Sequence, residues 1–109
     1  MTPPSCLITG GSSGIGRATA LLAARGGYRV AIASLPAHAD DSARVVQAIR
    51  DGGGQAVALH GDVALRADIE RLFGEAESAI GPLTAVVNGA GVYRESRVDA
   101  YEFDALAHM

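Results

Sequence analysis

The sequence predicts one α/β domain built on a parallel β-sheet, and three observations lead to this class. Four short apolar runs alternate with three longer segments whose apolar residues recur at helical spacing. Each pair of consecutive runs is joined by one such segment, the connection that parallel strands require. Glycine clusters mark the ends of the helical segments. Together these features predict four parallel strands linked by right-handed crossovers.

Composition fits one folded domain and excludes several kinds of partner. The 109 residues suffice for a modest core, and 49% of them are hydrophobic. All nine basic residues are arginine, and with twelve acidic residues they leave a net charge of −3, which indicates no nucleic-acid partner. Cys6 is the single cysteine and is expected to be a buried spectator. No signal peptide or membrane-spanning stretch is recognisable, so we expect a cytoplasmic protein without a membrane partner.

The first predicted unit is a strand at residues 6–9 followed by a helix at residues 15–24. The apolar run Cys6-Leu7-Ile8 forms the strand, and Gly26 and Gly27 end the helix. Four apolar residues of this helix share one face, which we expect to pack on the sheet: Ile15, Ala18, Leu21 and Leu22.

The second strand is expected at residues 28–34, where a continuous apolar centre suits burial on both faces. Residues 35–39 break it. Asp40, Asp41 or Ser42 can cap a second helix, whose inward face carries Val45, Val46 and Ile49. Residues 52–54, all glycine, end this helix, and residues 55–60 form the third strand.

A third helix is expected at residues 66–79, with charged residues opposite its apolar face. The apolar face comprises Ile69, Leu72, Phe73 and Ala76. Gly81-Pro82 ends the helix, and the fourth strand covers residues 83–87 and reads as buried. Further along, Asp99 and Glu102 form a plausible capping box for a last short helix.

Residues 9–16, Thr-Gly-Gly-Ser-Ser-Gly-Ile-Gly, lie between the first strand and the first helix, where a glycine-rich turn can bind a phosphate. Gly10 suits the sharp reversal, Gly14 the close approach of a pyrophosphate, and Gly16 the contact of helix with strand. The free N–H groups of the helix start then face the phosphates. Ser12 and Ser13 add hydroxyl donors at the lip. A plain connection between strand and helix is the alternative.

Ligands bind at the carboxyl ends of the strands in an open α/β sheet. Four such ends carry small or polar residues here: the glycine turn, Ser34-Leu35, Asp62-Val63 and residues 88–91. Each also has a purely structural interpretation, because Asp62 could cap the following turn and Asn88 could be a hydrogen-bonding residue at the sheet end. The three histidines show no metal-ligand spacing, so no metal is expected.

Segments 9–20, 61–63 and 88–91 together resemble the N-terminal half of a classical short-chain dehydrogenase/reductase, especially members such as oxoacyl carrier-protein reductases and sugar dehydrogenases. The resemblance implies a Rossmann-type, doubly wound parallel sheet in which residues 1–109 form a dinucleotide-binding domain, incomplete at its C-terminal end. It also implies an NAD(P)-dependent oxidoreductase. The full-length protein would transfer hydride between the nicotinamide and a small carbonyl or alcohol substrate, and it would be a homo-oligomer.

The resemblance also assigns roles to residues. The turn from Gly10 to Gly16 would hold the pyrophosphate, and Asp62 would accept a hydrogen bond from the adenine amino group. Asn88 would brace the fourth strand and touch the ribose, although the family usually has asparagine where Gly89 stands. The expected cofactor-binding residues are Gly10, Ser12, Ser13, Gly14, Ile15, Gly16, Ser34, Asp62, Val63, Asn88, Ala90 and Gly91.

The choice between the two dinucleotides depends on what meets the adenosine 2′ position. An acid at the end of the second strand would select NAD, and an arginine would favour NADP. The residues there, Ala33-Ser34-Leu35, include neither. Because nothing repels a 2′-phosphate and Ser12, Ser13, Ser34 or Arg17 could donate to it, we expect NADP(H) in preference to NAD(H).

The family's catalytic pair is a tyrosine followed four residues later by a lysine, and this sequence contains no lysine. Tyr93 and Arg97 have the spacing by coincidence. No catalytic residue is therefore assigned, and the 109 residues alone are expected to be inactive. The family's fourth strand is interior, so its edge would be exposed here, which favours a longer parent protein. The alternative is a non-catalytic nucleotide-binding half-domain or an inactive fragment.

Overall fold

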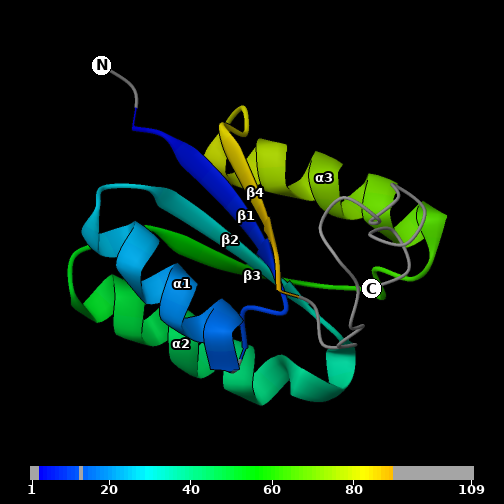
Figure 1. Ribbon diagram of the computed structural model, residues 1–109, viewed down its shortest axis with the longest axis horizontal. Helices are drawn as coiled ribbons and strands as arrows, with labels where there is room; N and C mark the ends of the chain where they lie inside the picture. Colours follow the sequence, from blue (N-terminus) through cyan, green and yellow to red (C-terminus); the bar gives the residue numbers. More distant parts are fainter. Residues whose placement is uncertain (1–2, 13, 90–109) are drawn as a thin grey trace, which may run out of the picture.

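The computed structural model describes residues 3–12 and 14–89, which form one parallel sheet covered by helices on both faces (Figure 1). The elements in chain order are β1 (Ser5–Thr9), α1 (Gly14–Arg25), β2 (Arg29–Ser34), the 3₁₀ helix η1 (Pro36–His38), α2 (Ala39–Asp51), β3 (Ala56–His60), α3 (Arg66–Ile80) and β4 (Ala85–Asn88). The strand order is β3-β2-β1-β4, with every pair parallel. Helices α1 and α2 lie on one face and α3 on the other. The predicted α/β class and doubly wound architecture are confirmed.

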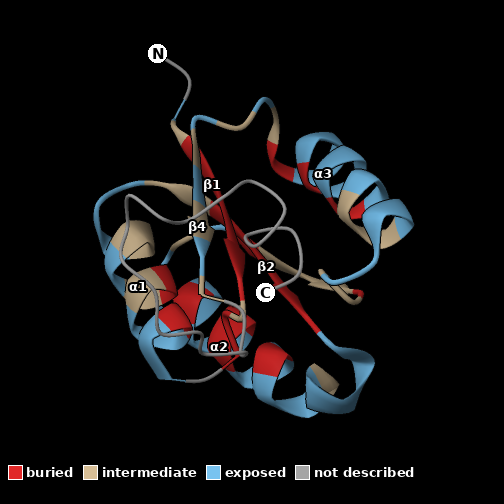
Figure 2. Ribbon diagram, turned by 45° about the vertical axis from the view of Figure 1, so that its right-hand side comes forward, coloured by how far each residue is buried: buried red, intermediate tan, exposed pale blue. Residues whose placement is uncertain are grey.

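The core consists of two apolar layers, one on each face of the sheet. Strands β1 and β2 are almost wholly buried, as Figure 2 shows. Alternate residues of β1 point to opposite faces. Cys6 and Ile8 belong to the layer beneath α1 and α2, whereas Leu7 packs beneath α3 with Leu72 and Ala76. The continuous apolar pattern of residues 30–33 is thus explained by burial on both faces.

Helix α1 packs on the sheet through a face that includes only one of the four predicted residues, Leu21, which lies against the core. Gly16 and Ala20 are its buried residues, whereas Ile15 is 84% and Leu22 66% exposed. Gly16 must contact the turn that precedes the helix, and this contact fixes the rotation of the helix about its axis. The predicted burial is therefore wrong for Ile15, Ala18 and Leu22, which are exposed, because apolar spacing alone does not include that contact.

Helix α2 buries Val45, Val46 and Ile49 as predicted, but its predicted cap is wrong. The helix begins at Ala39 directly after η1, and its N-cap residue, His38, makes no side-chain capping bond. The candidate caps therefore lie inside the first turn. Asp40 and Asp41 are two of them, and acidic residues there complement the helix dipole.

Helix α3 buries Leu72, Ala76 and Ile80, while the predicted core residue Phe73 is 37% exposed. The helix end is tied to the sheet, because the Ser5 hydroxyl donates to the Ile80 carbonyl oxygen at 2.6 Å. Leu72, Ala76 and Ile80 recur every four residues and so share one row along the helix, and Phe73 lies beside that row.

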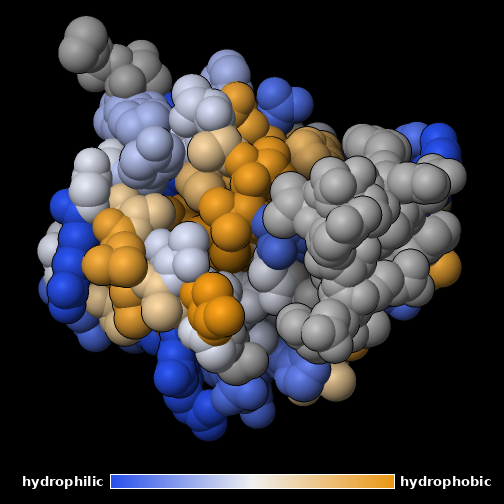
Figure 3. Space-filling model, viewed as in Figure 1, coloured by the Kyte–Doolittle hydropathy of each residue, from blue (hydrophilic) through white to orange (hydrophobic). Residues whose placement is uncertain are grey.

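Strand β4 is less buried than the sequence predicts, since its residues alternate between half-buried and exposed. Within the described residues it pairs only with β1, and Val86 is 49% exposed. Figure 3 shows apolar surface over β4 and α1, where Val86, Ile15 and Leu22 are exposed. The expected exposed edge is confirmed. The predicted helix after Asp99 lies outside the described residues.

Candidate functional site

The carboxyl ends of the four strands meet at one edge of the sheet, which we call the carboxyl edge: residues 10–12, 34–35, 61–63 and 88–89. The strand register brings two of these ends together, because Thr9 pairs with both Ala33 and Asn88. Every described candidate from the sequence lies on this edge or in the adjoining first turn of α1. Three predicted residues, Ser13, Ala90 and Gly91, lie outside the described residues.

The turn between β1 and α1 requires glycine at particular positions. Gly10 and Gly14 have φ angles of 69° and 59°, in the left-handed region that side chains disfavour. A Cβ added to Gly16 would lie 2.0 Å from the Gly10 carbonyl oxygen, so only hydrogen fits there. The Gly10 N–H donates to the Ala33 carbonyl oxygen at 2.8 Å, which joins the turn to β2. The backbone angles of Gly10 and Gly14 and the close contact of Gly16 thus explain why the turn has glycine at these three positions.

The side of the turn that faces away from the sheet is open at Gly14. Among the described residues, a Cβ added there would meet no atom within 4 Å, and α1 begins at this residue. The first N–H groups of a helix have no partner within the helix and carry the positive end of its dipole. At Gly14, the start of α1 and its free N–H groups therefore border open space. This arrangement suits the binding of an anion.

Two turn residues differ in exposure from what the sequence suggests. Ser12 is 6% exposed, so its hydroxyl is not at an exposed lip. The neighbouring Gly11 explains this, because a Cβ there would lie 2.6 Å from the Ile32 Cγ2 atom, and the turn is therefore seated tightly on the sheet. Ile15, in contrast, is on the open side of α1.

The end of β4 is fixed to β1 and to the glycine turn. The Thr9 hydroxyl donates to Asn88 Oδ1 at 2.8 Å, and the Gly89 N–H donates to the Thr9 carbonyl oxygen at 2.9 Å. A Cβ added to Gly89 would lie 3.0 Å from that oxygen and 3.4 Å from the Gly16 Cα atom. The hydrogen bond from Thr9 to Asn88 supports the bracing role predicted for Asn88. The backbone around Gly89 is packed so closely that it leaves little space for a side chain.

The end of β2 offers fewer donors than expected. The Ser34 side chain is buried, and its hydroxyl lies 2.5 Å from the Ser42 hydroxyl. This contact ties β2 to the first turns of α2 and occupies Ser34. Leu35, the next residue, is 44% exposed. Of the described candidates for a 2′-phosphate, Arg17 is the one on an exposed position.

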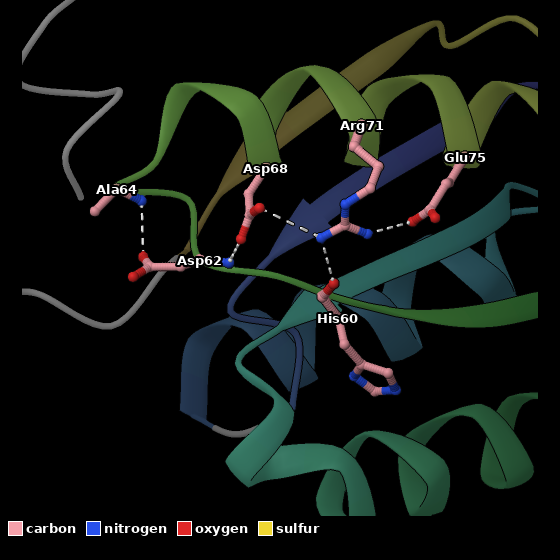
Figure 4. Close-up of polar contacts among 6 residues, drawn as sticks. All are labelled: His60, Asp62, Ala64, Asp68, Arg71 and Glu75. Atoms are coloured by element: carbon pink, nitrogen blue, oxygen red, sulfur yellow. Dashed lines mark hydrogen bonds and ion pairs between the residues drawn. The ribbon is translucent and has the colours of Figure 1, made fainter.

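The end of β3 is held by several polar contacts, which Figure 4 shows. Asp62 Oδ1 accepts the Ala64 N–H at 2.9 Å, and the Asp62 carbonyl oxygen accepts the Leu65 N–H at 2.9 Å. The structural interpretation of Asp62 as a turn cap is therefore correct. Val63, the other predicted residue of this segment, is half-buried. The Asp62 N–H in turn donates to Asp68 Oδ2 at 2.8 Å.

Titratable groups outside this edge add no reactive centre in the described residues. Cys6 is 3% exposed within the core, and burial raises the pKa of its thiol. The predicted burial of Cys6 is confirmed. Residues 3–12 and 14–89 contain no cluster of three His, Cys, Asp or Glu side chains that could hold a metal ion. None of the helices in the same residues is long and apolar enough to span a bilayer.

Sequence reasoning missed five residues that shape the carboxyl edge. Thr9 and Gly89 fix the end of β4, Gly11 seats the turn on Ile32, and Asp68 and Arg71 hold the end of β3. The role of Thr9 could have been predicted, because a polar residue at the end of a buried strand usually has a hydrogen-bond partner there. The roles of Asp68 and Arg71 depend on the rotation of α3, which the sequence does not specify to one residue.

Comparison with known proteins adds the family. A family model described as short chain dehydrogenase matches residues 5–109. The 3-oxoacyl-[acyl-carrier-protein] reductase of Mus musculus is 42% identical over 91 residues, covering 84% of this chain and 36% of the relative. A dehydrogenase/reductase from Sinorhizobium meliloti 1021 has a TM-score of 0.82 at 32% identity, over 99% of this chain and 44% of that chain. A short chain dehydrogenase/reductase from Burkholderia phymatum, solved in complex with NAD, has a TM-score of 0.72 at 28% identity, over 78% of this chain and 30% of that chain.

This chain therefore spans less than half the length of these relatives. The strand order and the alternating helices match the N-terminal portion of their Rossmann-like fold. The resemblance drawn from the three sequence motifs is confirmed by the family match over nearly the whole chain. The chain belongs to the short-chain dehydrogenase/reductase family.

Proposed function

We propose that this chain is the cofactor-binding part of an NAD(P)-dependent oxidoreductase. In the whole protein, hydride would pass between the nicotinamide and a small carbonyl or alcohol substrate. Several relatives bear the name 3-oxoacyl-[acyl-carrier-protein] reductase. The family membership supports the reaction class, and it likewise supports a homo-oligomeric whole protein.

One observation carries the proposal, the open main chain at Gly14 where α1 begins. The residues present fit a dinucleotide: Gly10 and Gly14 take left-handed angles, and Gly16 leaves room for the helix to start directly over the turn. The N–H groups there would bind the pyrophosphate. Asp62 and Val63 would hold the adenine, and Asn88 the adjoining ribose. When bound, the cofactor supplies the hydride acceptor or donor.

The choice of dinucleotide is proposed as NADP(H) in preference to NAD(H). The end of β2 carries no acidic residue that would repel a 2′-phosphate. Because Ser34 is engaged with Ser42, Arg17 in the first turn of α1 is the remaining described donor on an exposed position. Arginine suits a phosphate through its planar set of donors.

A second candidate function has one specific observation in its favour. The 109 residues contain no lysine, so the family's Tyr-x-x-x-Lys pair is absent from them. A half-domain that binds a dinucleotide without catalysing hydride transfer would need nothing more than the carboxyl edge.

Titration with NADPH and NADH, followed by the fluorescence of the reduced nicotinamide, tests binding. Oxidation of the bound cofactor by a panel of 3-oxoacyl thioesters and small ketones then separates an enzyme from a binder. The intact mass of the natural polypeptide, with its coding sequence read onward, identifies which residues contribute to that activity. Absence of saturable binding of both dinucleotides would refute the proposal, and binding without turnover would favour the second candidate.

A further inference from the structure

Side chains of α3 hold the backbone on both sides of Gly61, at the end of β3. The Asp62 N–H donates to Asp68 Oδ2 at 2.8 Å. Arg71 Nη2 donates to the His60 carbonyl oxygen at 3.0 Å. In Figure 4 these two contacts reach down from the same helix to consecutive parts of one short segment. The path of residues 60–62 is thus set by α3 as well as by the sheet.

The two α3 residues also contact each other. Arg71 Nη2 lies 3.6 Å from Asp68 Oδ1, and Arg71 Nη1 donates to Glu75 Oε1 at 3.0 Å. The guanidinium group is therefore flanked by two carboxylates, and its planar geometry gives it one orientation over the segment. A Cβ added to Gly61 would lie 2.8 Å from Arg71 Nη2, so glycine at this position matches the place that the guanidinium occupies.

The Asp62 carboxylate is oriented by the backbone that this pair holds. Its Oδ1 atom accepts the Ala64 N–H, so the side chain and the following turn move together. On the other side, the Gly61 N–H donates to the Ser34 carbonyl oxygen at 2.9 Å. Without the contacts from α3, the Asp62 N–H would lose its partner and the turn could rotate about residue 61.

We infer that Asp68 and Arg71 are positioning residues for adenine recognition by Asp62. They act through the backbone of residues 60–62, which keeps the Asp62 carboxylate in the orientation that accepts the adenine amino group. The inference rests on the proposed function, in which Asp62 makes that contact. Preorganised acceptors bind more tightly because less ordering is left to the binding step.

A stability role alone would not require this arrangement. The side chains of Asp68 and Arg71 are 28% and 45% exposed, and ion pairs in such positions contribute little to folding. The hydrogen bonds from Asp68 and Arg71 to the backbone, in contrast, hold the segment that carries Asp62, the residue that would recognise the adenine. The predicted consequence is therefore specific to the adenine amino group.

The test compares each reduced dinucleotide with its hypoxanthine analogue, in which an oxygen replaces the adenine amino group. The natural polypeptide that carries this chain should bind the adenine form about tenfold more tightly, the value expected for one hydrogen bond to a charged acceptor. Asp68→Ala and Arg71→Gln should reduce this ratio toward one by weakening binding of the adenine form. Affinity for the hypoxanthine analogue should stay within about twofold, whereas a general structural defect would weaken both ligands.

Matched variants separate the positioning effect of Asp68 and Arg71 from the effects of lost charge and of impaired folding. Asp41→Ala removes an ion pair of the same i, i+3 spacing on α2, where Arg44 Nη1 lies 2.6 Å from Asp41 Oδ1. It should leave the ratio unchanged. Asp68→Asn keeps an oxygen that can accept the Asp62 N–H, so it should retain most of the ratio. If Asp68→Ala does not fold, Arg71→Gln carries the comparison, with Asp68→Asn as the variant that should retain the ratio.

The outcomes distinguish the inference from the function on which it rests. Loss of the ratio in Asp62→Asn, with the ratio kept in Asp68→Ala and Arg71→Gln, would overturn the inference while Asp62 keeps its role. Equal weakening of both ligands in the two α3 variants would overturn it as well. If the unaltered protein binds neither dinucleotide, the proposed function itself fails.

Discussion

Gly16 lies so close to Gly10 that a Cβ on Gly16 would be 2.0 Å from the Gly10 carbonyl oxygen. No side chain can be accommodated at that distance without moving the backbone. The first turn of α1 is therefore seated directly on the turn that follows β1. This contact fixes the rotation of α1 and brings the open main chain at Gly14 to the carboxyl edge.

Gly16→Ala should destabilise the fold and abolish dinucleotide binding. Overpacking of this kind costs about 1–3 kcal/mol in the free energy of unfolding, which urea denaturation measures. Gly74→Ala is the matched control, because Gly74 lies within α3 and a Cβ there would meet no described atom within 4 Å. That control should gain about 0.5–1 kcal/mol from helix propensity. Unchanged stability in Gly16→Ala would contradict the contact.

Ser42→Ala should lower the free energy of unfolding by more than the loss of one oxygen atom from the side chain would suggest. It leaves the Ser34 hydroxyl buried without the partner that lies 2.5 Å away. An unsatisfied buried hydroxyl costs about 1–3 kcal/mol. The double variant Ser34→Ala/Ser42→Ala removes both groups, so its loss in unfolding free energy should be smaller than the sum of the two single losses. Additive losses would show that the hydroxyls do not interact.

Leu35→Asp should shift cofactor preference toward NADH. Leu35 is the first exposed residue after β2, and a carboxylate there would accept from a ribose 2′-OH and repel a 2′-phosphate. We expect the ratio of NADPH to NADH affinity to fall by about tenfold, or about 1.4 kcal/mol. Leu22→Asp adds the same charge at an exposed position of α1 and should leave the ratio unchanged. Equal shifts in both variants would indicate a net-charge effect.

The buried thiol of Cys6 should make the folded state less stable at alkaline pH. Burial raises the pKa of its thiol above the ordinary value of 9.0, so the folded state holds the proton more tightly than the unfolded state. The stabilisation is fully present below pH 9.0 and is lost as the pH rises through the folded-state pKa. Unfolding free energies measured from pH 7 upward should therefore fall more steeply for the natural sequence than for Cys6→Ala. Parallel profiles would contradict this.

Much of the fold was predictable because burial leaves a clear pattern in the sequence. The continuous apolar run in β2 and the spacing of Val45, Val46 and Ile49 in α2 follow from packing on a sheet that is covered on both faces. The glycine clusters located the ends of α1, α2 and α3 to within one residue or so. Such features are local, and local sequence specifies them.

The errors involve contacts between distant elements. The exposure of Ile15, Ala18 and Leu22 on α1 does not follow from the sequence, because Gly16 has no side chain to appear in an apolar pattern although its contact with Gly10 sets the helix rotation. The predicted burial of Phe73 is wrong because this residue lies at the border of the buried row of α3, and the sequence does not specify the helix rotation to one residue. At the site, the glycine geometry followed from the motif, whereas the contacts of Asp68 and Arg71 depended on three-dimensional packing.

A pair of glycine variants tests whether the open main chain at Gly14 binds a dinucleotide. Gly14 and Gly53 both have positive φ, 59° and 87°, and a Cβ at either would meet nothing within 4 Å in the part of the chain that the structure describes. Each change to alanine should cost about 1–2 kcal/mol in backbone strain. Only Gly14→Ala fills space at the carboxyl edge, since Gly53 lies in the turn before β3.

The measurement is the affinity for NADPH and NADH of the natural polypeptide and of both variants, by titration of the reduced nicotinamide fluorescence. We expect saturable binding that Gly14→Ala abolishes and Gly53→Ala retains, with similar losses of stability in the two variants. Absence of binding to the unaltered protein, or equal affinity in the two variants, would contradict this expectation.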